Sequence, residues 1–232
     1  MTVLVGTTLA AMAMSHHDTW SAWLMHAERI RQFYDGDVHF FAAIQLDGRG
    51  IDPFVPLLAR LDDLGGEHWT YTLDDGRDRV TMTNRWRHIT FGQNLVVERA
   101  QSDPSVSHLL FCAADCAPPS DVIPRMLEMN HPLVAPYINT YGLRGDHVAG
   151  YPFPVERAMA SAACVFIARD VFRRIRWRWD LDDQMSDDPC YHHDAKHLLG
   201  VDTLVRLDVR AMHYPEAIGD YESRGLDTVV HR

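Results

Sequence analysis

The stretch Val106-Ser-His-Leu-Leu-Phe-Cys-Ala-Ala-Asp-Cys-Ala-Pro-Pro119 decides how the rest of the chain is interpreted. Its first half is a short apolar run, which ends abruptly in the carboxylate of Asp115. Two prolines then turn the chain into a predicted helix, whose first N–H groups can donate to the side chain of Ser120 or Asp121. In open α/β sheets ligands bind beyond the carboxyl ends of strands, so this pattern predicts that Asp115 faces a binding crevice. A role as a simple turn cap is the alternative.

Strand-like and helix-like segments alternate at short spacing along the rest of the chain. Apolar runs predict strands over residues 3–7, 38–45, 68–73, 108–114, 133–138, 160–168 and 203–209. Amphipathic periodicity predicts helices over residues 18–34, 53–64, 89–100, 121–129 and 169–175, and over a segment with Tyr191, Ala195 and Leu198 on one face that ends at Gly200. The sequence therefore predicts an α/β fold with a mostly parallel sheet flanked by helices. We expect a single domain over residues 1–232, with its core over 2–214 and a polar tail over 215–232.

The length and charge of the chain narrow the classes of function. At 232 residues the chain is long enough for one large domain, and its 47% hydrophobic and 23% charged residues are typical of a globular protein. The formal net charge of −10 argues against a general nucleic-acid binder, because duplex binding draws much of its affinity from Lys and Arg side chains. No run approaches the roughly 18 apolar residues that a membrane span requires.

The cysteines and the N-terminal stretch indicate a cytoplasmic protein. The four cysteines form no CxxC pair and lie in apolar or strand-like segments, at positions 112, 116, 164 and 190. Residues 2–14 are apolar but lack the positively charged start of a signal peptide, so they are interpreted as a first buried strand and its exit loop. Reduced thiols in a cytoplasmic compartment are therefore expected.

In the order of its elements the chain resembles the GT-A fold glycosyltransferases, and among them the family 2-like enzymes of the compact phage and actinobacterial type. The most specific segment is His108-Leu-Leu-Phe-Cys-Ala-Ala-Asp-Cys-Ala-Pro-Pro-Ser-Asp121, which is similar to the family's LLFLDADV segment with its two prolines and acid. Residues 160–172 are similar to the family's small-residue strand and Arg-initiated helix. Ser186-Asp-Asp-Pro-Cys-Tyr191, with Ala195 and Gly200, is similar to its ED-x-x-F block.

A fourth piece of the resemblance concerns a metal ion. His213 matches the His that completes a metal site in many members, and all four pieces occur in the family's order. The resemblance implies transfer of a sugar from a UDP- or GDP-sugar donor, with Mn²⁺ or Mg²⁺ bridging Asp115, His213 and the donor diphosphate. The chemistry is independent of the family, because a diphosphate leaving group develops negative charge that a bound cation offsets.

Two acids at the start of the last predicted helix are the candidates for proton transfer. The resemblance implies that Asp188 is the general base that removes a proton from the acceptor hydroxyl group, with Asp187 beside it. Direct displacement with inversion would follow. The alternative is a pair of N-terminal caps favoured by the helix dipole.

The remaining donor contacts follow from the same resemblance. Thr7 and Asp47, at the ends of the first two strands, and Asn94 are placed where family members hold the donor, as is the segment Ala113-Ala114-Asp115. Ala113 stands where the family has the first of its paired acids, and Gln93 stands where relatives often have Arg. These departures leave open a second hypothesis, a degenerate nucleotide- or sugar-binding protein without turnover.

The acceptor could be a saccharide, a small molecule or a modified DNA base. In the segment Phe172-Arg-Arg-Ile-Arg-Trp-Arg-Trp179 aromatic side chains alternate with arginines, so Trp177 or Trp179 could stack on a sugar ring or a nucleobase. Tyr141 belongs to a long loop, which is more often a functional flap than filler. The alternative for the tryptophans is packing beneath the sheet, with the arginines directed outward.

A pair of histidines suggests a different class of enzyme. His193 and His197 are four residues apart on one face of a predicted helix, and His193 followed by Asp194 resembles metal-dependent phosphohydrolases. Those domains are all-helical, whereas this chain contains several strands with β-branched residues. A solvated helix face is the simpler interpretation.

Overall fold

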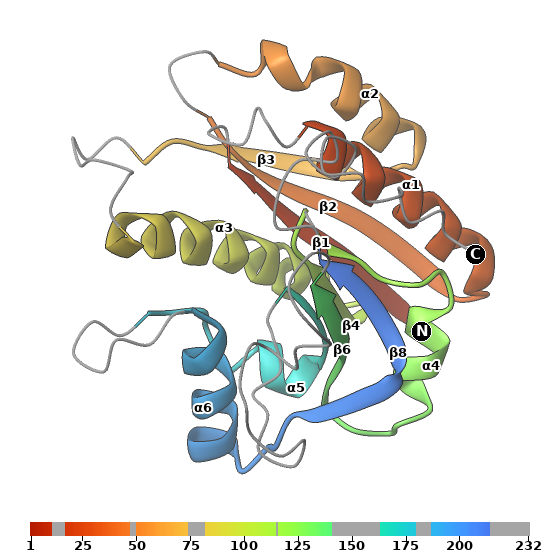
Figure 1. Cartoon of the computed structure of the whole chain (residues 1–232), viewed down its shortest axis with the longest axis vertical. Coiled ribbons are helices and arrows are strands. Elements are labelled where there is room, and N and C mark those ends of the chain that lie inside the picture. Colours follow the sequence, from red (N-terminus) through yellow and green to blue (C-terminus); the bar gives the residue numbers. More distant parts are fainter. Residues whose placement is uncertain are drawn as a thin grey trace.

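The computed structural model describes residues 1–10, 17–46, 50–73, 82–114, 116–140, 163–179 and 187–213. Within these residues, eight strands form one sheet in the order β3-β2-β1-β4-β7-β6-β8-β5 (Figure 1). The strands are β1 (Thr2–Ala10), β2 (Asp37–Gln45), β3 (Glu67–Tyr71), β4 (Val106–Cys112), β5 (Cys116–Ala117), β6 (Leu133–Thr140), β7 (Cys164–Ala168) and β8 (Leu204–His213). The helices are α1 (His17–Phe33), the 3-10 helix η2 (Asp52–Phe54), α2 (Val55–Asp63), α3 (Met82–Ser102), α4 (Val122–Leu127), α5 (Arg169–Phe172) and α6 (Asp187–Leu199).

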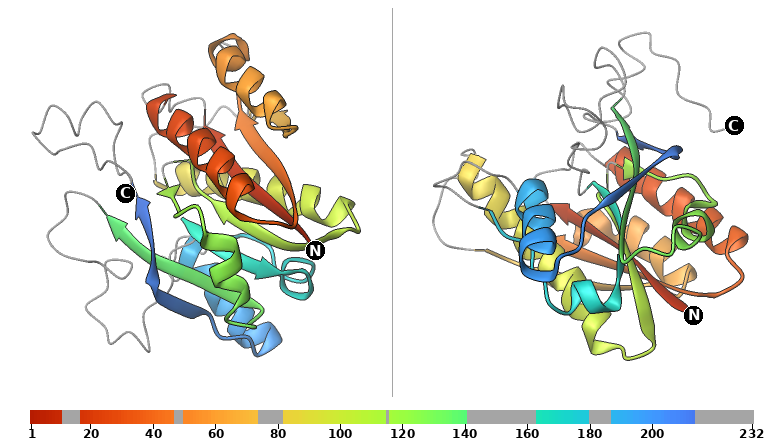
Figure 2. Two further views of the ribbon diagram at one scale, coloured as in Figure 1. Left: turned by 90° about the vertical axis from the view of Figure 1, so that its right-hand side faces the viewer. Right: turned by 90° about the horizontal axis from the view of Figure 1, so that it is seen from below.

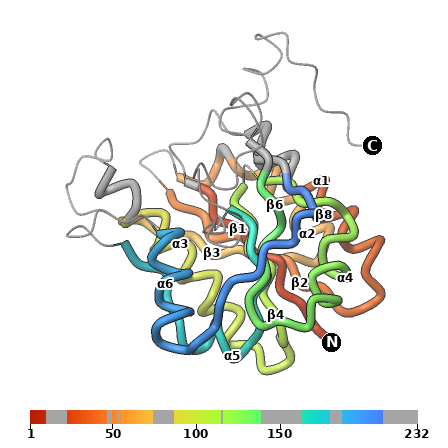
Figure 3. Tube along the Cα trace, turned by 60° about the horizontal axis from the view of Figure 1, so that its bottom comes forward, coloured from red at the N-terminus to blue at the C-terminus, as the bar shows by residue number. Residues whose placement is uncertain are grey.

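The direction of the strands sets which ends meet at the candidate site. β3, β2, β1 and β4 are mutually parallel, as the alternation of helices and strands predicts. β7 is antiparallel to both of its neighbours, β4 and β6, whereas β6 and β8 run side by side in parallel (Figure 3). β8 therefore points the same way as β4, and the carboxyl ends of β1 to β4, β6 and β8 lie at one edge of the sheet.

Apolar residues cover both faces of the sheet. On one face, residues of α1, α2 and α4 join one buried cluster, and on the other face residues of α3, α5 and α6 join a second (Figures 1 and 2). Along β1, Val3 and Val5 belong to the first cluster and Leu4 to the second, as expected for side chains that alternate across a strand. The fold is thus three-layered, with helices on both sides of a mixed sheet.

The helix boundaries correct two sequence expectations. α3 begins at Met82, seven residues before the predicted start, because its first turns are polar and carry no apolar periodicity. In α6 the buried row passes through Tyr191 and Ala195 to the partly buried Leu199, whereas Leu198 is 65% exposed and was wrongly placed on that face. None of the helices in the described stretches is long and apolar enough to cross a membrane.

The turn before α4 also differs from the prediction. Asp121 is the N-cap residue of α4, but its side chain makes no capping hydrogen bond. Its carboxylate instead lies 3.7 Å from the guanidinium of Arg125, one turn along the same helix. The first turn of α4 therefore lacks the side-chain cap that Asp121 was expected to supply.

The four cysteines agree with the expectation of reduced thiols. All four are buried, and none of them forms a disulfide bond. Cys112 and Cys164 are directly opposite in the antiparallel pair of β4 and β7, with their sulfur atoms 3.4 Å apart. Burial raises the pKa of both thiols, which keeps them protonated.

α3 packs directly on β1 because Gly6 has no side chain. A Cβ atom at Gly6 would lie 2.2 Å from Cγ1 of Val96, and a β-branched side chain cannot move aside easily. We expect Gly6→Ala to lower the free energy of unfolding by about 1–3 kcal/mol, measured by denaturant unfolding. If the contact with Val96 is the cause, Val96→Ala in the same chain will recover part of the loss. If the decreases in free energy of unfolding caused by Gly6→Ala and by Val96→Ala simply add in the double variant, this explanation is wrong.

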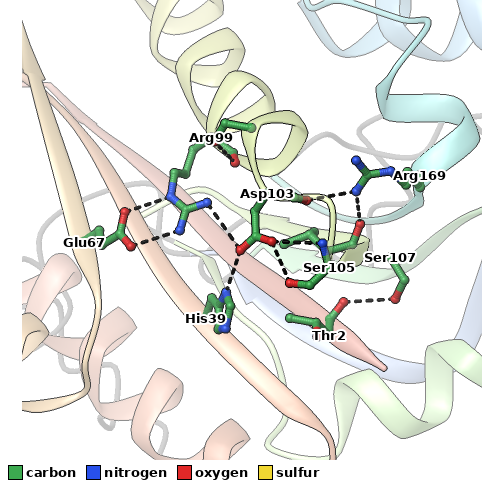
Figure 4. A network of polar contacts seen from close by, with 10 residues as sticks. Thr2, His39, Glu67, Arg99, Asp103, Ser105, Ser107 and Arg169 are labelled. Atoms are coloured by element: carbon green, nitrogen blue, oxygen red, sulfur yellow. Dashed lines mark hydrogen bonds and ion pairs between the residues drawn. The ribbon is translucent and has the colours of Figure 1, made fainter.

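The amino edge of the sheet is held by a network of charged groups (Figure 4). Arg99 in α3 donates two hydrogen bonds to Glu67 at the start of β3, at 2.8 and 2.9 Å, and these lower the pKa of Glu67. Asp103 lies 3.7 Å from Arg99 and 3.4 Å from Nδ1 of His39 in β2. Arg169 donates to the carbonyl groups of Asp103, at 3.0 Å, and Val106. These contacts fasten the end of α3 to the strands and leave the opposite edge for the site.

Candidate functional site

The orientation of α3 places its first half at the carboxyl edge of the sheet. His88 lies against Gln45, the last residue of β2, with Nδ1 of His88 2.5 Å from Nε2 of Gln45. Both side chains are buried, and the hydroxyl group of Tyr71, at the end of β3, donates to the carbonyl oxygen of His88 at 3.1 Å. Gln45 and His88 were missed by sequence reasoning. A polar amide that ends an otherwise apolar strand is the signal that could have found Gln45.

Thr7 lies near the carboxyl end of β1, where the sequence predicts a donor contact. Its side chain is fully buried, and its hydroxyl group has no hydrogen-bond partner within the part of the chain that the structure describes. A buried hydroxyl without a partner is costly, so a ligand or a water molecule is the expected partner. Asp47, the second predicted donor contact, lies outside the described residues.

The two predicted metal ligands belong to segments that pair in the sheet. Asp115 and the side chain of His213 lie outside what the structure describes, but the backbone of β8 is described up to His213. Cys116, which follows Asp115, is the direct partner of His213 in the antiparallel pair of β5 and β8. The sheet therefore brings position 213 beside the residue that follows position 115, although 98 residues separate 115 from 213 along the chain (213 − 115).

Ala113 and Ala114 lie at the end of β4 with their methyl groups in the apolar cluster. The N–H group of Ala113 donates to the carbonyl oxygen of Ala163 at 2.7 Å, which extends the pairing of β4 with the segment of β7. The N–H group of Cys116 donates to the carbonyl oxygen of Ala113 at 2.9 Å. Both alanines thus pack against the apolar cluster, and neither has a polar side-chain atom to offer to a donor.

The described residues alone do not form a metal site. Among them, no three His, Cys, Asp or Glu side chains come together in an arrangement that could hold a metal ion. The predicted set of a carboxylate from Asp115 and an imidazole from His213 suits Mn²⁺ or Mg²⁺ completed by phosphate oxygens, and it stays a prediction.

Asp187 is the first residue of α6 and is only 8% exposed. Its Oδ2 atom accepts a hydrogen bond from Nε2 of Gln93 in α3, at 2.8 Å. Burial raises the pKa of Asp187, and the hydrogen bonds with Gln93 and Asp188 only partly oppose that effect. Asp188 is partly exposed. The two acids therefore stand at a helix start, as predicted, and burial increases the proton affinity of Asp187.

Asn94 and Trp177 have roles in the scaffold. Nδ2 of Asn94 donates to the carbonyl oxygen of Trp177, and the N–H group of Trp177 donates to Oδ1 of Asn94, both at 2.9 Å. The ring of Trp177 is 2% exposed, and it stacks on Tyr191 with the centroids 3.9 Å apart. Trp177 is therefore packed in the interior, as the alternative predicts, and its ring has no exposed face on which an acceptor could stack. The acceptor prediction now rests on Trp179, which is partly exposed, and on Tyr141, which lies outside the described residues.

The histidine pair on α6 is exposed, as the simpler interpretation predicts. The ring centroids of His193 and His197 are 4.1 Å apart, and both residues face solvent. The neighbouring acid Asp194 accepts two hydrogen bonds of 2.7 and 2.8 Å from Arg178, which lower its pKa, and its Oδ1 atom also lies 3.3 Å from Nδ1 of His193. This arrangement ties α6 to the segment before it.

Comparison with known proteins gives the fold. The sequence matches no protein-family model and no curated protein. The structure is similar to that of a mannosyltransferase from Pyrobaculum calidifontis in complex with GDP-Man and Mn²⁺, with a TM-score of 0.54 and 12% identity over 95% of this chain. The chain spans 59% of the length of that enzyme.

Two nucleotidyl-transfer enzymes share the fold as well. A nucleoside-diphosphate-sugar pyrophosphorylase from Vibrio cholerae RC9 matches with a TM-score of 0.55 and 10% identity, over 97% of this chain and 99% of that one. A 4-diphosphocytidyl-2C-methyl-D-erythritol synthase from Anaerococcus prevotii matches with a TM-score of 0.51 and 9% identity, over 93% and 90% of the two chains. The chain therefore has a GT-A-like α/β fold, which confirms the predicted fold class.

Proposed function

We propose that the chain is a metal-dependent glycosyltransferase, which moves a sugar from a nucleotide-sugar donor to a hydroxyl group of an acceptor. The observation that supports this most is the pairing of Cys116 with His213, because it puts the ends of two segments with predicted metal ligands together. That pair lies at the edge of the sheet where the parallel strands end. Ligands of open α/β sheets bind at this edge.

In this proposal Asp115 and His213 hold Mn²⁺ or Mg²⁺. When bound, the cation would offset the negative charge that develops on the departing diphosphate. The similar Pyrobaculum enzyme was crystallised with GDP-Man and Mn²⁺, which supports a nucleotide-sugar and a divalent metal as the partners to test first.

The donor nucleoside would lie over the ends of β1 and β2. Thr7 offers a buried hydroxyl group near the end of β1, and Gln45 ends the neighbouring strand β2 with its amide against His88. Asp47 lies two residues after the end of β2 in the sequence, so it would add an acid at this edge of the sheet. Hydrogen-bonding groups of this kind are suited to a ribose or a base.

The acceptor hydroxyl group would be activated by the acids at the start of α6. The resemblance gives the role of general base to Asp188, with Asp187 beside it. Burial raises the pKa of Asp187, which favours proton uptake, so in this proposal Asp187 is the first candidate for the base and Asp188 the second. Attack by the acceptor oxygen on the sugar would then displace the diphosphate directly, with inversion. Trp179 and Tyr141 are the candidates for contact with a saccharide, a small molecule or a modified DNA base as acceptor.

The test is release of nucleoside diphosphate. The chain is incubated with UDP-glucose or GDP-mannose, with Mn²⁺, Mg²⁺ or EDTA, and UDP and GDP are measured. We expect one donor to be turned over with a metal dependence of at least about 100-fold, which several kcal/mol of charge stabilisation represents. Binding of a donor by calorimetry without any release would instead favour the degenerate binding protein, for which Ala113 is the sequence reason.

A further inference from the structure

Gln93 and Asp187 form a buried contact between two helices that are far apart in the sequence. Gln93 is 2% exposed and Asp187 is 8% exposed, and a single hydrogen bond of 2.8 Å joins them. Gln93 follows Gly92, whose missing side chain lets α3 pack against Thr8 of β1. The backbone of α3 therefore lies close to the sheet next to Gln93, and the side-chain amide of Gln93 reaches across to the first residue of α6.

We propose that Gln93 is a positioning residue for Asp187: its amide fixes the carboxylate at the start of α6 without adding a positive charge, so that Asp187 can accept a proton from an acceptor hydroxyl group. The inference rests on the proposed glycosyl transfer. In that reaction the acceptor oxygen bonds to the anomeric carbon, its proton moves to Asp187, and the electron pair of the sugar–phosphate bond leaves on the diphosphate.

A neutral amide suits this task because it can pair with both protonation states of a carboxyl group. Nε2 donates to the ionised carboxylate, and Oε1 can accept from the protonated form after the amide turns over. Oε1 of Gln93 is buried and has no partner within the described part of the chain. An Arg at this position has no acceptor for the proton of the neutral carboxyl group, and its charge favours the ionised form. A Met can neither donate nor accept in this way.

The described groups known to influence Asp187 are neutral or acidic. Besides burial, hydrogen bonds with the amide of Gln93 and with Asp188, its neighbour on α6, contribute to its pKa shift. In the segment before α6, Arg178 donates to Asp194 and Arg176 donates to Gln101. The acids at positions 180, 182 and 183 lie outside the described residues. Burial raises the pKa of Asp187, in agreement with a role in accepting a proton.

The test replaces Gln93 by Arg and by Met, each with and without Asp187→Asn. The first readout needs no donor: the melting temperature is measured from pH 4 to 8, and the difference between chains with and without Asp187→Asn isolates the titration of Asp187. The second readout is the pH dependence of nucleoside diphosphate release from the donor that the unsubstituted chain turns over, with Mn²⁺ present.

The Arg and Met variants are expected to shift the stability difference curve and the rate profile along the pH axis, each in the opposite direction to the other. In Gln93→Arg a nearby cation favours the ionised carboxylate, so the difference curve and the acidic limb of the rate profile shift to lower pH. In Gln93→Met the loss of a hydrogen bond to the ionised form shifts both to higher pH, and the plateau rate falls by about 100-fold because the carboxylate is no longer oriented. Met has a similar length, so this variant keeps the test valid if the Arg variant does not fold.

Gln101→Met is the matched control. Gln101 is on the same helix and its side chain also makes two hydrogen bonds, with Phe172 and Arg176. We expect this variant to lose stability without moving either curve. If neither the stability difference curve nor the rate profile of Gln93→Met shifts along the pH axis, the proposed role of Gln93 is wrong, whatever the rate of this variant. If the unsubstituted chain turns over neither UDP-glucose nor GDP-mannose, the proposed function fails, and with it the role in proton transfer, even where the stability curves move.

Discussion

Replacing Asp115 by Asn is expected to lower metal-dependent release of nucleoside diphosphate by about 1000-fold or more. The neutral amide is a weak ligand for Mn²⁺ or Mg²⁺, and the cation supplies several kcal/mol of stabilisation to the departing diphosphate. The measurement is the rate of release at increasing Mn²⁺, together with Mn²⁺ affinity by calorimetry. Both are expected to fall, because this position is next to the residue that pairs with His213.

The control for this variant is Asp121→Asn, the same substitution six residues further along. The side chain of Asp121 is 47% exposed and lies 3.7 Å from Arg125, so its loss is expected to leave Mn²⁺ dependence unchanged. The metal assignment would be wrong if Asp115→Asn kept the full response to Mn²⁺ while remaining folded. His213→Gln is expected to weaken Mn²⁺ binding in the same direction.

The strands and helices could be predicted from the sequence because their signals are local. The apolar runs that end in an acid or a glycine correspond to β1, β2, β3 and β4, and the three-and-four spacing of Trp23, Ala27 and Ile30 marks the buried face of α1. The beginning of α3 was missed because a helix whose first turns are polar shows no apolar stripe.

The contacts of the site depend on pairs of residues that no local pattern connects. Gln93 and Asp187 are 94 residues apart, and Asn94 and Trp177 are 83 residues apart. The alternation of aromatic and basic residues over 172–179 fits a binding surface and a packed segment equally well. Only the stacking of Trp177 on Tyr191 distinguishes them for that ring. No local pattern predicts the pairing of Cys116 with His213, and only the resemblance predicts that Asp115 and His213 bind one metal ion.

Two acids on α6 are expected to respond to the same substitution in opposite ways. Asp187 and Asp194 are both 8% exposed, but burial raises the pKa of Asp187, whereas the hydrogen bonds from Arg178 lower the pKa of Asp194. A raised pKa means that the folded chain holds the proton at a pH where the unfolded chain has lost it. The stability that Asp187 contributes is therefore full below its unfolded pKa, and it is lost as the pH rises through the folded pKa.

For Asp194 the sign is reversed. Its contribution is present above the unfolded pKa, and it is lost as the pH falls through the lowered folded pKa. At pH 7, Asp194→Asn is thus expected to lower the free energy of unfolding by about 1–3 kcal/mol, since it removes a charge-assisted pair of hydrogen bonds whose Arg178 partner is partly exposed. The loss is expected to shrink as the pH approaches 3. Nucleoside diphosphate release is expected to persist, because Asp194 faces Arg178 and not the edge of the sheet.

Asp187→Asn is expected to give the opposite combination, with higher stability at pH 7 and turnover lowered by about 10²–10⁴-fold. The Asn side chain can still accept from Gln93, so the contact between α3 and α6 is kept, while the buried charge and the proton acceptor are both removed. Denaturant unfolding at pH 4 and 7 gives the stability, and the gain should vanish at pH 4. An Asp187→Asn chain that is less stable at pH 7 would show that Asp187 is a structural cap. An unchanged rate would transfer the role of base to Asp188, for which Asp188→Asn is the corresponding test.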